Sequence, residues 1–77
     1  MATYQVKDSY PPFEYGSAVR WRRAGVPLLV GSICGFDVVA SEERAKAVGR
    51  PRGTVMVLVE ESSGVTVEVA LEELELI

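Results

Sequence analysis

Two valine-rich runs on either side of a short polar turn constrain the fold of this chain more than any other feature. The segment reads TVMVLVEESSGVTVEVA, residues 54–70, with Glu61-Ser62-Ser63-Gly64 at its centre. Valine favours strands, and glycine supplies the positive φ that short hairpin turns need. We therefore predict a β-hairpin here. One face of its first strand should carry Val55, Val57 and Val59, and one face of its second strand Val65, Val67 and Val69.

Two more strands are predicted upstream of the hairpin. Residues 17–23 read SAVRWRR, in which the valine and the tryptophan fall on one face of a strand and the first two arginines on the other. Residues 28–39 read LLVGSICGFDVV, an apolar run interrupted by Gly31 and Gly35. Glycine inside a strand indicates a bulge or a sharp bend, which a small barrel needs in order to close. The second run is therefore predicted to form one bent strand.

A long excursion, residues 37–53, separates the bent strand from the hairpin and has helical features. Ser41 is suited to cap the start of a helix, and the two glutamates after it suit a first helical turn. Gly49 and Pro51 are suited to end it. We predict a short helical turn or an ordered loop in this excursion.

The chain ends in LEELELI, which predicts one helical turn, Leu71 to Leu74, and a closing strand, Glu75 to Ile77. The complete order is strand, loop, bent strand, long loop, hairpin, single turn and short strand. This order predicts an all-β fold in which five strands form a small barrel. Its predicted core contains Val19, Trp21, Val30, Ile33, Val55, Val57, Val67 and Leu74.

The N-terminal residues are expected to form an extended arm, residues 1–12, ahead of a single barrel domain, residues 13–77. The arm ends in Pro11-Pro12, and two prolines favour an extended path. A domain of this size gains from any added apolar area, so aromatic side chains near the arm should cover one mouth of the barrel. The alternative is that Tyr10 and the two prolines belong to a subunit or partner interface. The aromatic residues are Tyr4, Tyr10, Phe13 and Tyr15.

Composition excludes several kinds of chemistry. The chain has 77 residues, no histidine and a single cysteine, Cys34. An internal disulfide, a structural zinc site and any mechanism with a histidine base are therefore excluded. Cys34 stands in an apolar strand and is predicted to fill the core as an inert thiol. The glutamates of the closing turn are predicted to be solvated rather than catalytic, because a raised carboxyl pKa needs burial.

No apolar run approaches the ~18 residues of a membrane span, and the N-terminus lacks a basic segment followed by an apolar one. A cytoplasmic protein without membrane, metal or cofactor is expected.

Charge is unevenly distributed. Residues 1–58 carry eight Lys/Arg and five Asp/Glu, whereas residues 59–77 carry six glutamates and no base, which gives the chain its net charge of −3. Such asymmetry can mark a partner surface. We predict Trp21 in the core and the neighbouring arginines on a solvated edge, paired with Glu60, Glu61 or Glu68. The candidate partner-binding patch consists of Arg20, Arg22, Arg23, Arg50 and Arg52.

The opening FEYGSAVRW and the closing VTVEVALEELELI resemble the bacterial SH3-like small barrel. The resemblance covers residues 13–77 and implies the barrel fold without implying any chemistry. The positions that carry it are Phe13, Gly16, Val19 and Arg20 at the start, and Glu72, Glu73, Leu74, Leu76 and Ile77 at the end.

Within this group the chain is similar to the type II dihydrofolate reductases, whose SH3-like protomers form a tetramer around one active pore. Their opening looks like FEYGSAVRW, and one of their strands looks like GSICGF, residues 31–36. The decisive Val-Gln-Ile-Tyr of that family is replaced here by Thr-Val-Glu-Val, residues 66–69, and Trp21 stands where a pore lysine is expected. No catalytic or cofactor-binding residue carries over.

A second similarity is to the SH3-like accessory subunits of photosynthetic electron-transfer complexes, which dock an acidic ferredoxin through a basic surface. The hypothesis from sequence is thus a small non-enzymatic interaction module that docks a protein partner, or associates with itself, through exposed strands and a basic loop surface. Two alternatives stay open: a nucleic-acid-binding barrel like the KOW and Tudor modules, and a diverged pore enzyme in a homotetramer.

Overall fold

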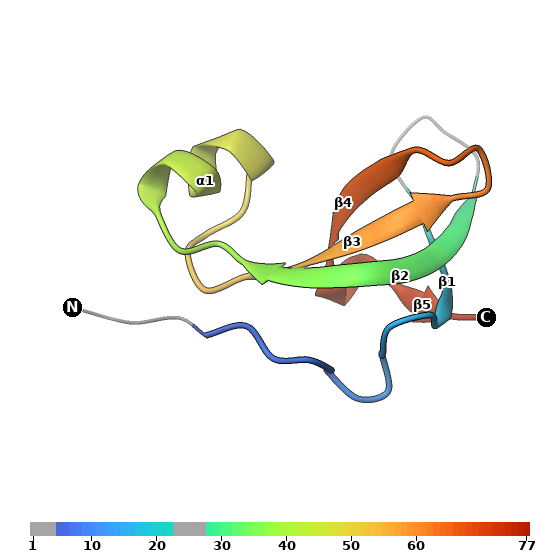
Figure 1. The fold of residues 1–77 in the computed structure, drawn as a ribbon. Coiled ribbons are helices and arrows are strands. Elements are labelled where there is room, and N and C mark those ends of the chain that lie inside the picture. Colours follow the sequence, from blue (N-terminus) through green and yellow to red (C-terminus); the bar gives the residue numbers. More distant parts are fainter. Residues whose placement is uncertain (1–4, 23–27) are drawn as a thin grey trace.

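The fold is a single antiparallel sheet of five strands with one short α-helix beside it (Figure 1). The computed structural model describes residues 5–22 and 28–77. The strands follow the order β4-β3-β2-β1-β5, so that β4 and β5 are the two edges and the sheet is not closed by hydrogen bonds between them. No helix in the described part of the chain is long and apolar enough to cross a lipid bilayer. The strands are β1 (Ala18–Trp21), β2 (Leu29–Val38), β3 (Val55–Glu61), β4 (Thr66–Ala70) and β5 (Glu75–Leu76).

The predicted valine hairpin is confirmed as β3 and β4. Val57 lies opposite Val69, and Glu61 N–H donates to the carbonyl of Val65 over 2.9 Å. Gly64 has a φ of 91°, which an L side chain rarely adopts. Val57, Val59 and Val69 are fully buried, Val55 and Val67 are half-buried, and Val65 is exposed because it belongs to the turn.

The predicted bend in β2 is a β-bulge. The pairing of β2 with β3 passes from Ile33 opposite Val59 directly to Gly35 opposite Leu58, which leaves Cys34 without a partner residue. The extra residue puts Cys34 on the exposed side of the strand, so the prediction that it fills the core is wrong.

A second correction concerns Val30, which was predicted in the core and is 46% exposed. Val30 lies directly opposite Arg20 in the pairing of β1 with β2. Residues directly opposite each other in an antiparallel pair share a face, and the face that carries Arg20 is turned to solvent.

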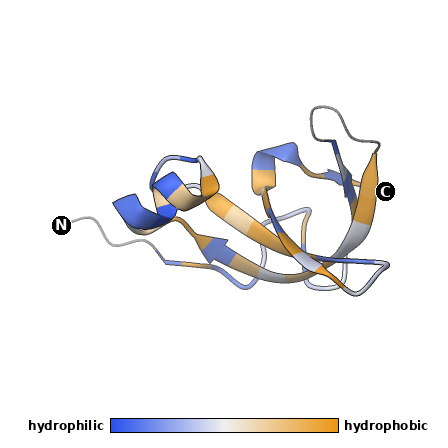
Figure 2. Ribbon diagram, turned by 90° about the horizontal axis from the view of Figure 1, so that it is seen from above, coloured by the Kyte–Doolittle hydropathy of each residue, from blue (hydrophilic) through white to orange (hydrophobic). Residues whose placement is uncertain are grey.

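The core has two parts. In the larger part β1, β2, β3, β4 and the last turn contribute buried side chains, and the half-buried Tyr10 and Phe13 pack against them. In the smaller part Val39, Met56 and Ala70 are covered by α1. Figure 2 shows that apolar residues follow the strands, whereas α1 is mostly hydrophilic. The predicted core is confirmed for five of its members, each under 9% exposed: Val19, Trp21, Ile33, Val57 and Leu74.

The predicted helical turn is α1 (Glu42–Val48). The hydroxyl of Ser41 accepts a hydrogen bond from Arg44 N–H over 3.2 Å, and Gly49 ends the helix with a φ of 70°. Arg44 reaches from the helix to the sheet, where its Nη2 lies 2.7 Å from Glu68 Oε2 on β4 and 3.6 Å from an Asp37 oxygen on β2. The hydrogen bond to Glu68 raises the pKa of Arg44, because the carboxylate favours the charged guanidinium.

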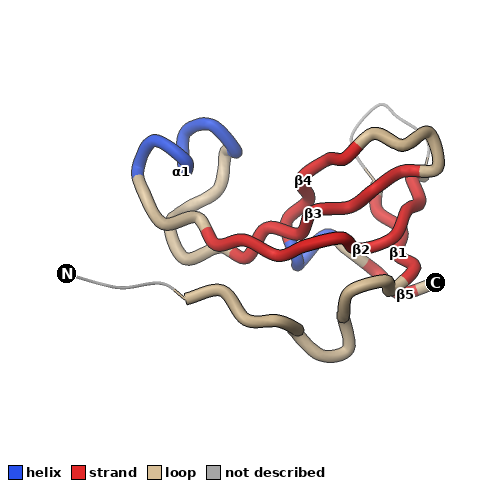
Figure 3. The backbone as a smooth tube through the Cα atoms, in the orientation of Figure 1, coloured by secondary structure: helices blue, strands red, loops and turns tan. Residues whose placement is uncertain are grey.

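Residues 5–17 contain no regular strand or helix, and they run alongside the sheet (Figure 3). The ring of Tyr10 lies 5.2 Å from that of Phe36, and the ring of Tyr15 meets Phe36 edge-on at 5.4 Å. Both tyrosines therefore contact an aromatic residue of the core, whereas the barrel mouth that they were predicted to cover is not formed by this open sheet. Tyr4 lies outside the described residues.

The chain closes as predicted, with the single turn η1 (Leu71–Glu73) followed by β5. Leu74 N–H donates to the carbonyl of Leu71 over 3.2 Å, and the buried Leu74 side chain fixes the turn to the core. β5 then pairs with β1, and Glu75 comes to lie opposite Arg20.

Candidate functional site

Three of the five predicted patch arginines come together around two adjoining hollows in the surface. Arg22 and Arg50 line one hollow, and Arg20 and Arg22 line the other. Arg52 lines neither and lies 3.6 Å from Glu42 of α1. Arg23 lies outside the described residues. Of the predicted patch, Arg20, Arg22 and Arg50 are the described residues that line these hollows.

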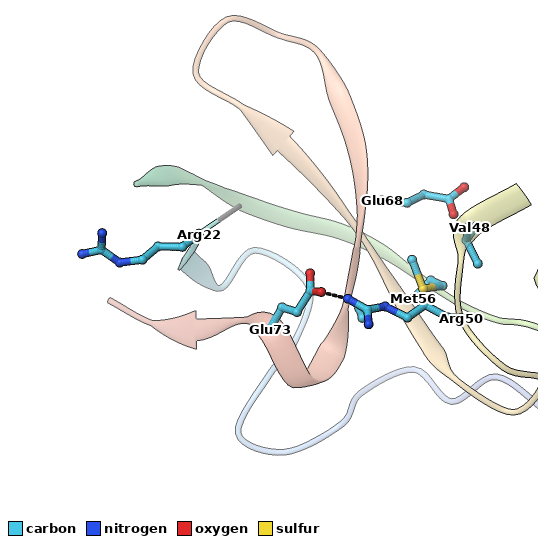
Figure 4. A pocket seen from close by; sticks show the side chains of 7 residues that line it. Arg22, Val48, Arg50, Met56, Glu68 and Glu73 are labelled. Carbon is cyan, nitrogen blue, oxygen red and sulfur yellow. Dashed lines mark ion pairs between the residues drawn. The ribbon is translucent and has the colours of Figure 1, made fainter. Parts of the chain in front are cut away.

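The hollow lined by Arg22 and Arg50, which we call the edge hollow, lies beside β4, an edge strand of the sheet. It has a volume of about 480 Å³ (Figure 4). The Glu73 and Arg50 side chains point toward each other as an ion pair, and the Arg22 side chain extends away from them. The lining comes from five separate segments, and it consists of Arg22, Val48, Arg50, Met56, Glu68, Ala70 and Glu73.

The second, the tryptophan hollow, has a volume of about 400 Å³. It shares Arg22 and Glu73 with the edge hollow, so the two hollows adjoin. Two more of its lining residues are Trp21, which belongs to the core, and the exposed Leu28. The pairing of β1 with β5 completes it by adding Arg20 and Glu75.

Two of the three arginines that line these hollows, Arg20 and Arg50, form ion pairs with glutamates of the same chain. Arg20 Nε lies 3.1 Å from Glu75 Oε2, and Arg50 pairs with Glu73 and lies 3.8 Å from Glu72. Arg22 has no ion pair within the described ranges. The surface is therefore of mixed charge, with one unpaired arginine, rather than uniformly basic.

These pairs correct two expectations. The predicted acidic partners were glutamates of the hairpin, but Arg20 pairs with Glu75, because β5 brings it directly opposite. The glutamates of the closing turn were predicted to be freely solvated. That holds for Glu72 and Glu75, whose side chains are 72% and 69% exposed, but the Glu73 side chain is only 32% exposed and is paired.

Trp21 contributes a feature that the sequence does not reveal. The indole is 1% exposed, and its Nε1 is buried without a hydrogen-bond partner. Among the side chains of residues 5–22 and 28–77, no other buried nitrogen or oxygen lacks a partner. A buried donor without an acceptor costs about 1–3 kcal/mol, which is a sizeable loss for a domain this small.

A third hollow, of about 630 Å³, lies between Phe13, the loop that follows α1, and η1. Its walls include Phe13, Val55, Leu71 and Leu74, and Arg50 also lines it. We call it the apolar hollow. Arg50 therefore stands between a charged depression and an apolar one.

The described residues contain no group of three or more Cys, Asp or Glu placed to hold a metal ion. Cys34 is exposed, and its thiol donates to the carbonyl of Leu58 over 3.4 Å, away from both arginine-lined hollows.

Comparison of the chain with protein-family models, with curated proteins and with solved structures finds no match.

Proposed function

We propose that this protein is an SH3-like small barrel that acts as a non-enzymatic interaction module and docks an acidic protein partner. The strand order β4-β3-β2-β1-β5, the bulge in a long β2 and the single helical turn between β4 and β5 are compatible with a barrel of this kind. The opening segment that resembles SH3-like barrels contains β1 and the residues before it. The closing segment contains β4, η1 and β5.

The observation that carries the docking proposal is that Arg20, Arg22 and Arg50 line two adjoining hollows. Arg22 has no ion pair with any described residue, and the Arg20 and Arg50 side chains are 46% and 34% exposed. Ion pairs at exposed positions contribute only about 0–1 kcal/mol, so a partner carboxylate can replace the chain's own glutamates at little cost. The neighbouring apolar hollow offers room for an apolar side chain of the same partner.

The nucleic-acid alternative has less support. Glu73 and Glu75 line the same depression as the arginines and would repel a row of phosphates. Single-stranded nucleic acids also stack their bases on exposed aromatic rings, whereas Trp21 is buried.

An acidic peptide tests the proposal directly. Hexaglutamate, acetylated and amidated at its ends, is titrated against the protein at low and at high salt, beside a DNA oligonucleotide of the same length. We expect the peptide to bind at low salt, and Arg22→Glu to abolish the binding. Lys46→Glu on the exposed face of α1 makes the same change in net charge away from the hollows and should retain it. Equal binding by both variants would remove the arginine cluster from the proposal, and tighter binding of the DNA would favour the nucleic-acid alternative.

The molar mass in solution separates the pore-enzyme alternative from the proposal. One small barrel offers no deep pocket, so a pore enzyme needs a symmetric tetramer. Light scattering at several concentrations should give a monomer or a concentration-dependent dimer. A concentration-independent tetramer would instead direct the search to nicotinamide and pterin ligands.

A further inference from the structure

The apolar hollow gathers three large apolar side chains that are only half-buried: Phe13, Val55 and Leu71. The buried Leu74 belongs to the same lining. Apolar area that stays in contact with water at one hollow favours the binding of another apolar group there. The volume of about 630 Å³ lies within the range of ligand-binding sites, ~300–1,000 Å³.

Local hydrogen bonds hold the walls of this hollow. Phe13 and Tyr10 exchange two backbone hydrogen bonds, of 2.8 and 3.0 Å. In the loop after α1, the Thr54 hydroxyl donates to the carbonyl of Pro51 over 2.7 Å. The third wall, η1, is closed by its own backbone hydrogen bond. Because each wall is fixed within its own segment, a ligand does not have to order the hollow when it binds.

Arg50 joins this hollow to the charged one, since it lines both the apolar hollow and the edge hollow. Its Nη2 pairs with Glu73, which lines the edge hollow (Figure 4). Its Nη1 lies 3.8 Å from Oε1 of Glu72, which lines the apolar hollow. This separation is longer than a hydrogen bond, and the Glu72 side chain is 72% exposed. Nη1 can therefore donate to the carboxylate of a ligand beside the apolar hollow.

We propose that the apolar hollow and Arg50 Nη1 together bind a large apolar side chain and a neighbouring carboxylate on one segment of the acidic partner. This inference rests on the proposed docking function and names what the partner must carry. The apolar side chain fills the hollow, and the carboxylate takes the place of Glu72, while Glu73 stays on Nη2.

Charge selects an acidic segment over other apolar segments. Arg20 and Arg22 line the hollows that adjoin Arg50 on its charged side, so a basic segment would meet like charges. A neutral apolar segment would cover Arg50 without offering Nη1 an acceptor. A carboxylate next to the apolar side chain offers that acceptor, and hydrogen bonds between ionised groups are stronger than neutral ones.

The experiment uses three peptides of seven residues, acetylated and amidated at their ends. The phenylalanine peptide has three glutamates on each side of one phenylalanine. The alanine peptide replaces that phenylalanine by alanine, and the glutamine peptide keeps it but replaces the six glutamates by glutamine. Affinities are measured by calorimetry at low salt.

Two pairs of variants accompany the peptides. Leu71→Gln makes the wall of the hollow polar, and Leu76→Gln makes the same change at a 40% exposed leucine of β5. Arg50→Gln removes the shared cation, and Arg52→Gln makes the same change two positions away. Neither Leu76 nor Arg52 lines the apolar hollow or the edge hollow. Circular dichroism and urea unfolding establish that each variant is folded.

We expect the phenylalanine peptide to bind roughly tenfold more tightly than the alanine peptide, because part of its ring leaves water. Leu71→Gln should reduce this advantage to about twofold or less, whereas Leu76→Gln should preserve it. Arg50→Gln should weaken binding of the phenylalanine peptide roughly tenfold, the usual loss for a hydrogen bond to a charged group, and Arg52→Gln by less than about threefold.

Nuclear Overhauser effects between the peptide ring and carbon-13-labelled methyl groups locate the phenylalanine without any variant. We expect them from Val55, Leu71 and Leu74, which line the hollow. This measurement decides the question if Leu71→Gln does not fold. Contacts to the exposed Leu28 or Val30 instead of these three residues would overturn the proposed site.

The contrary results separate this inference from the docking function. Equal binding of the phenylalanine and alanine peptides would overturn the apolar site and leave docking of an acidic partner standing. Equal binding of the phenylalanine and glutamine peptides would overturn the acidic partner and with it both proposals, as would no binding of any peptide. A dimer in light scattering that Leu71→Gln and the phenylalanine peptide each dissociate would assign the hollow to a second copy of the chain and overturn the inference.

Discussion

Arg20 and Glu75 face each other across the pairing of β1 with β5, with Arg20 Nε 3.1 Å from Glu75 Oε2. The two residues are 55 positions apart in the chain, and the contact joins the first strand to the last. Their side chains are 46% and 69% exposed, so the pair adds little to stability. We expect its larger effect to be on binding, because the Glu75 carboxylate already pairs with Arg20, which belongs to the proposed docking surface.

Removal of this glutamate should therefore strengthen binding. In Glu75→Gln, Arg20 loses its carboxylate and becomes available to an acidic partner. We expect tighter binding of hexaglutamate, with a change in the free energy of unfolding of no more than about 1 kcal/mol. Glu60→Gln makes the same change in charge on the exposed face of β3 and should leave the affinity nearly unchanged. Equal gains from both variants would show that net charge alone governs binding.

The two glycines of β2 should differ in their tolerance of a methyl group. At Gly31 an added Cβ would lie 2.6 Å from the backbone oxygen of Glu60, whereas at Gly35 it would lie 2.9 Å from Cδ1 of the Leu58 side chain. A side-chain end can rotate away, but a paired backbone cannot. We expect Gly31→Ala to lower the free energy of unfolding by about 2–3 kcal/mol and Gly35→Ala by about 1 kcal/mol, measured by urea unfolding. A larger loss for Gly35→Ala than for Gly31→Ala would contradict this account of the two glycines.

Ser41 should stabilise α1 through its cap. Its hydroxyl accepts from Arg44 N–H, and the helix has only seven residues. Ser41→Ala should cost about 1 kcal/mol in urea unfolding, and Ser41→Asp should restore most of the loss because aspartate also caps helices. Hydrogen exchange should quicken in α1 before it does in β3. A loss spread evenly over both elements would argue against a local role for the cap.

The exposed thiol of Cys34 should react in the folded protein. Because the bulge turns this side chain away from the core, a thiol reagent is expected to modify it without denaturant. Cys34→Ser should change stability by no more than about 0.5 kcal/mol, as is usual for exposed positions. A thiol that reacts only after urea unfolding would indicate that Cys34 is buried, as the sequence pattern predicted, and would contradict its exposed position in the bulge.

The parts of the fold that could be predicted from sequence depend on residues close together in the chain. The hairpin follows from valine runs around Gly64, and α1 follows from Ser41 and Gly49, because turn and cap chemistry act over a few positions. The errors depend on pairing between distant segments. Val30 is exposed because it pairs with Arg20, and alternation within its own strand does not reveal which face looks inward.

The candidate site was less predictable than the fold, for the same reason. Five arginines could be selected by type, but only the folded chain decides which of them meet. The partner of Arg20 is Glu75 on β5, and the partner of Arg50 is Glu73 in η1. Each partner lies more than 20 positions away in the chain. The lack of a hydrogen-bond partner for Trp21 Nε1 could not be predicted from the sequence, since a tryptophan on the apolar face of a strand is ordinarily assigned to packing alone.

The free edge of β4 bears on how this protein behaves when many copies are crowded together. An edge strand offers unpaired backbone groups on which another copy could build a continuous fibre. Glu68 stands in the middle of this strand, held in place by Arg44 from α1. A second β4 laid antiparallel against the first, centred on this residue, would have to crowd one Arg44–Glu68 pair against another, so α1 places charged side chains in the way of edge-to-edge pairing.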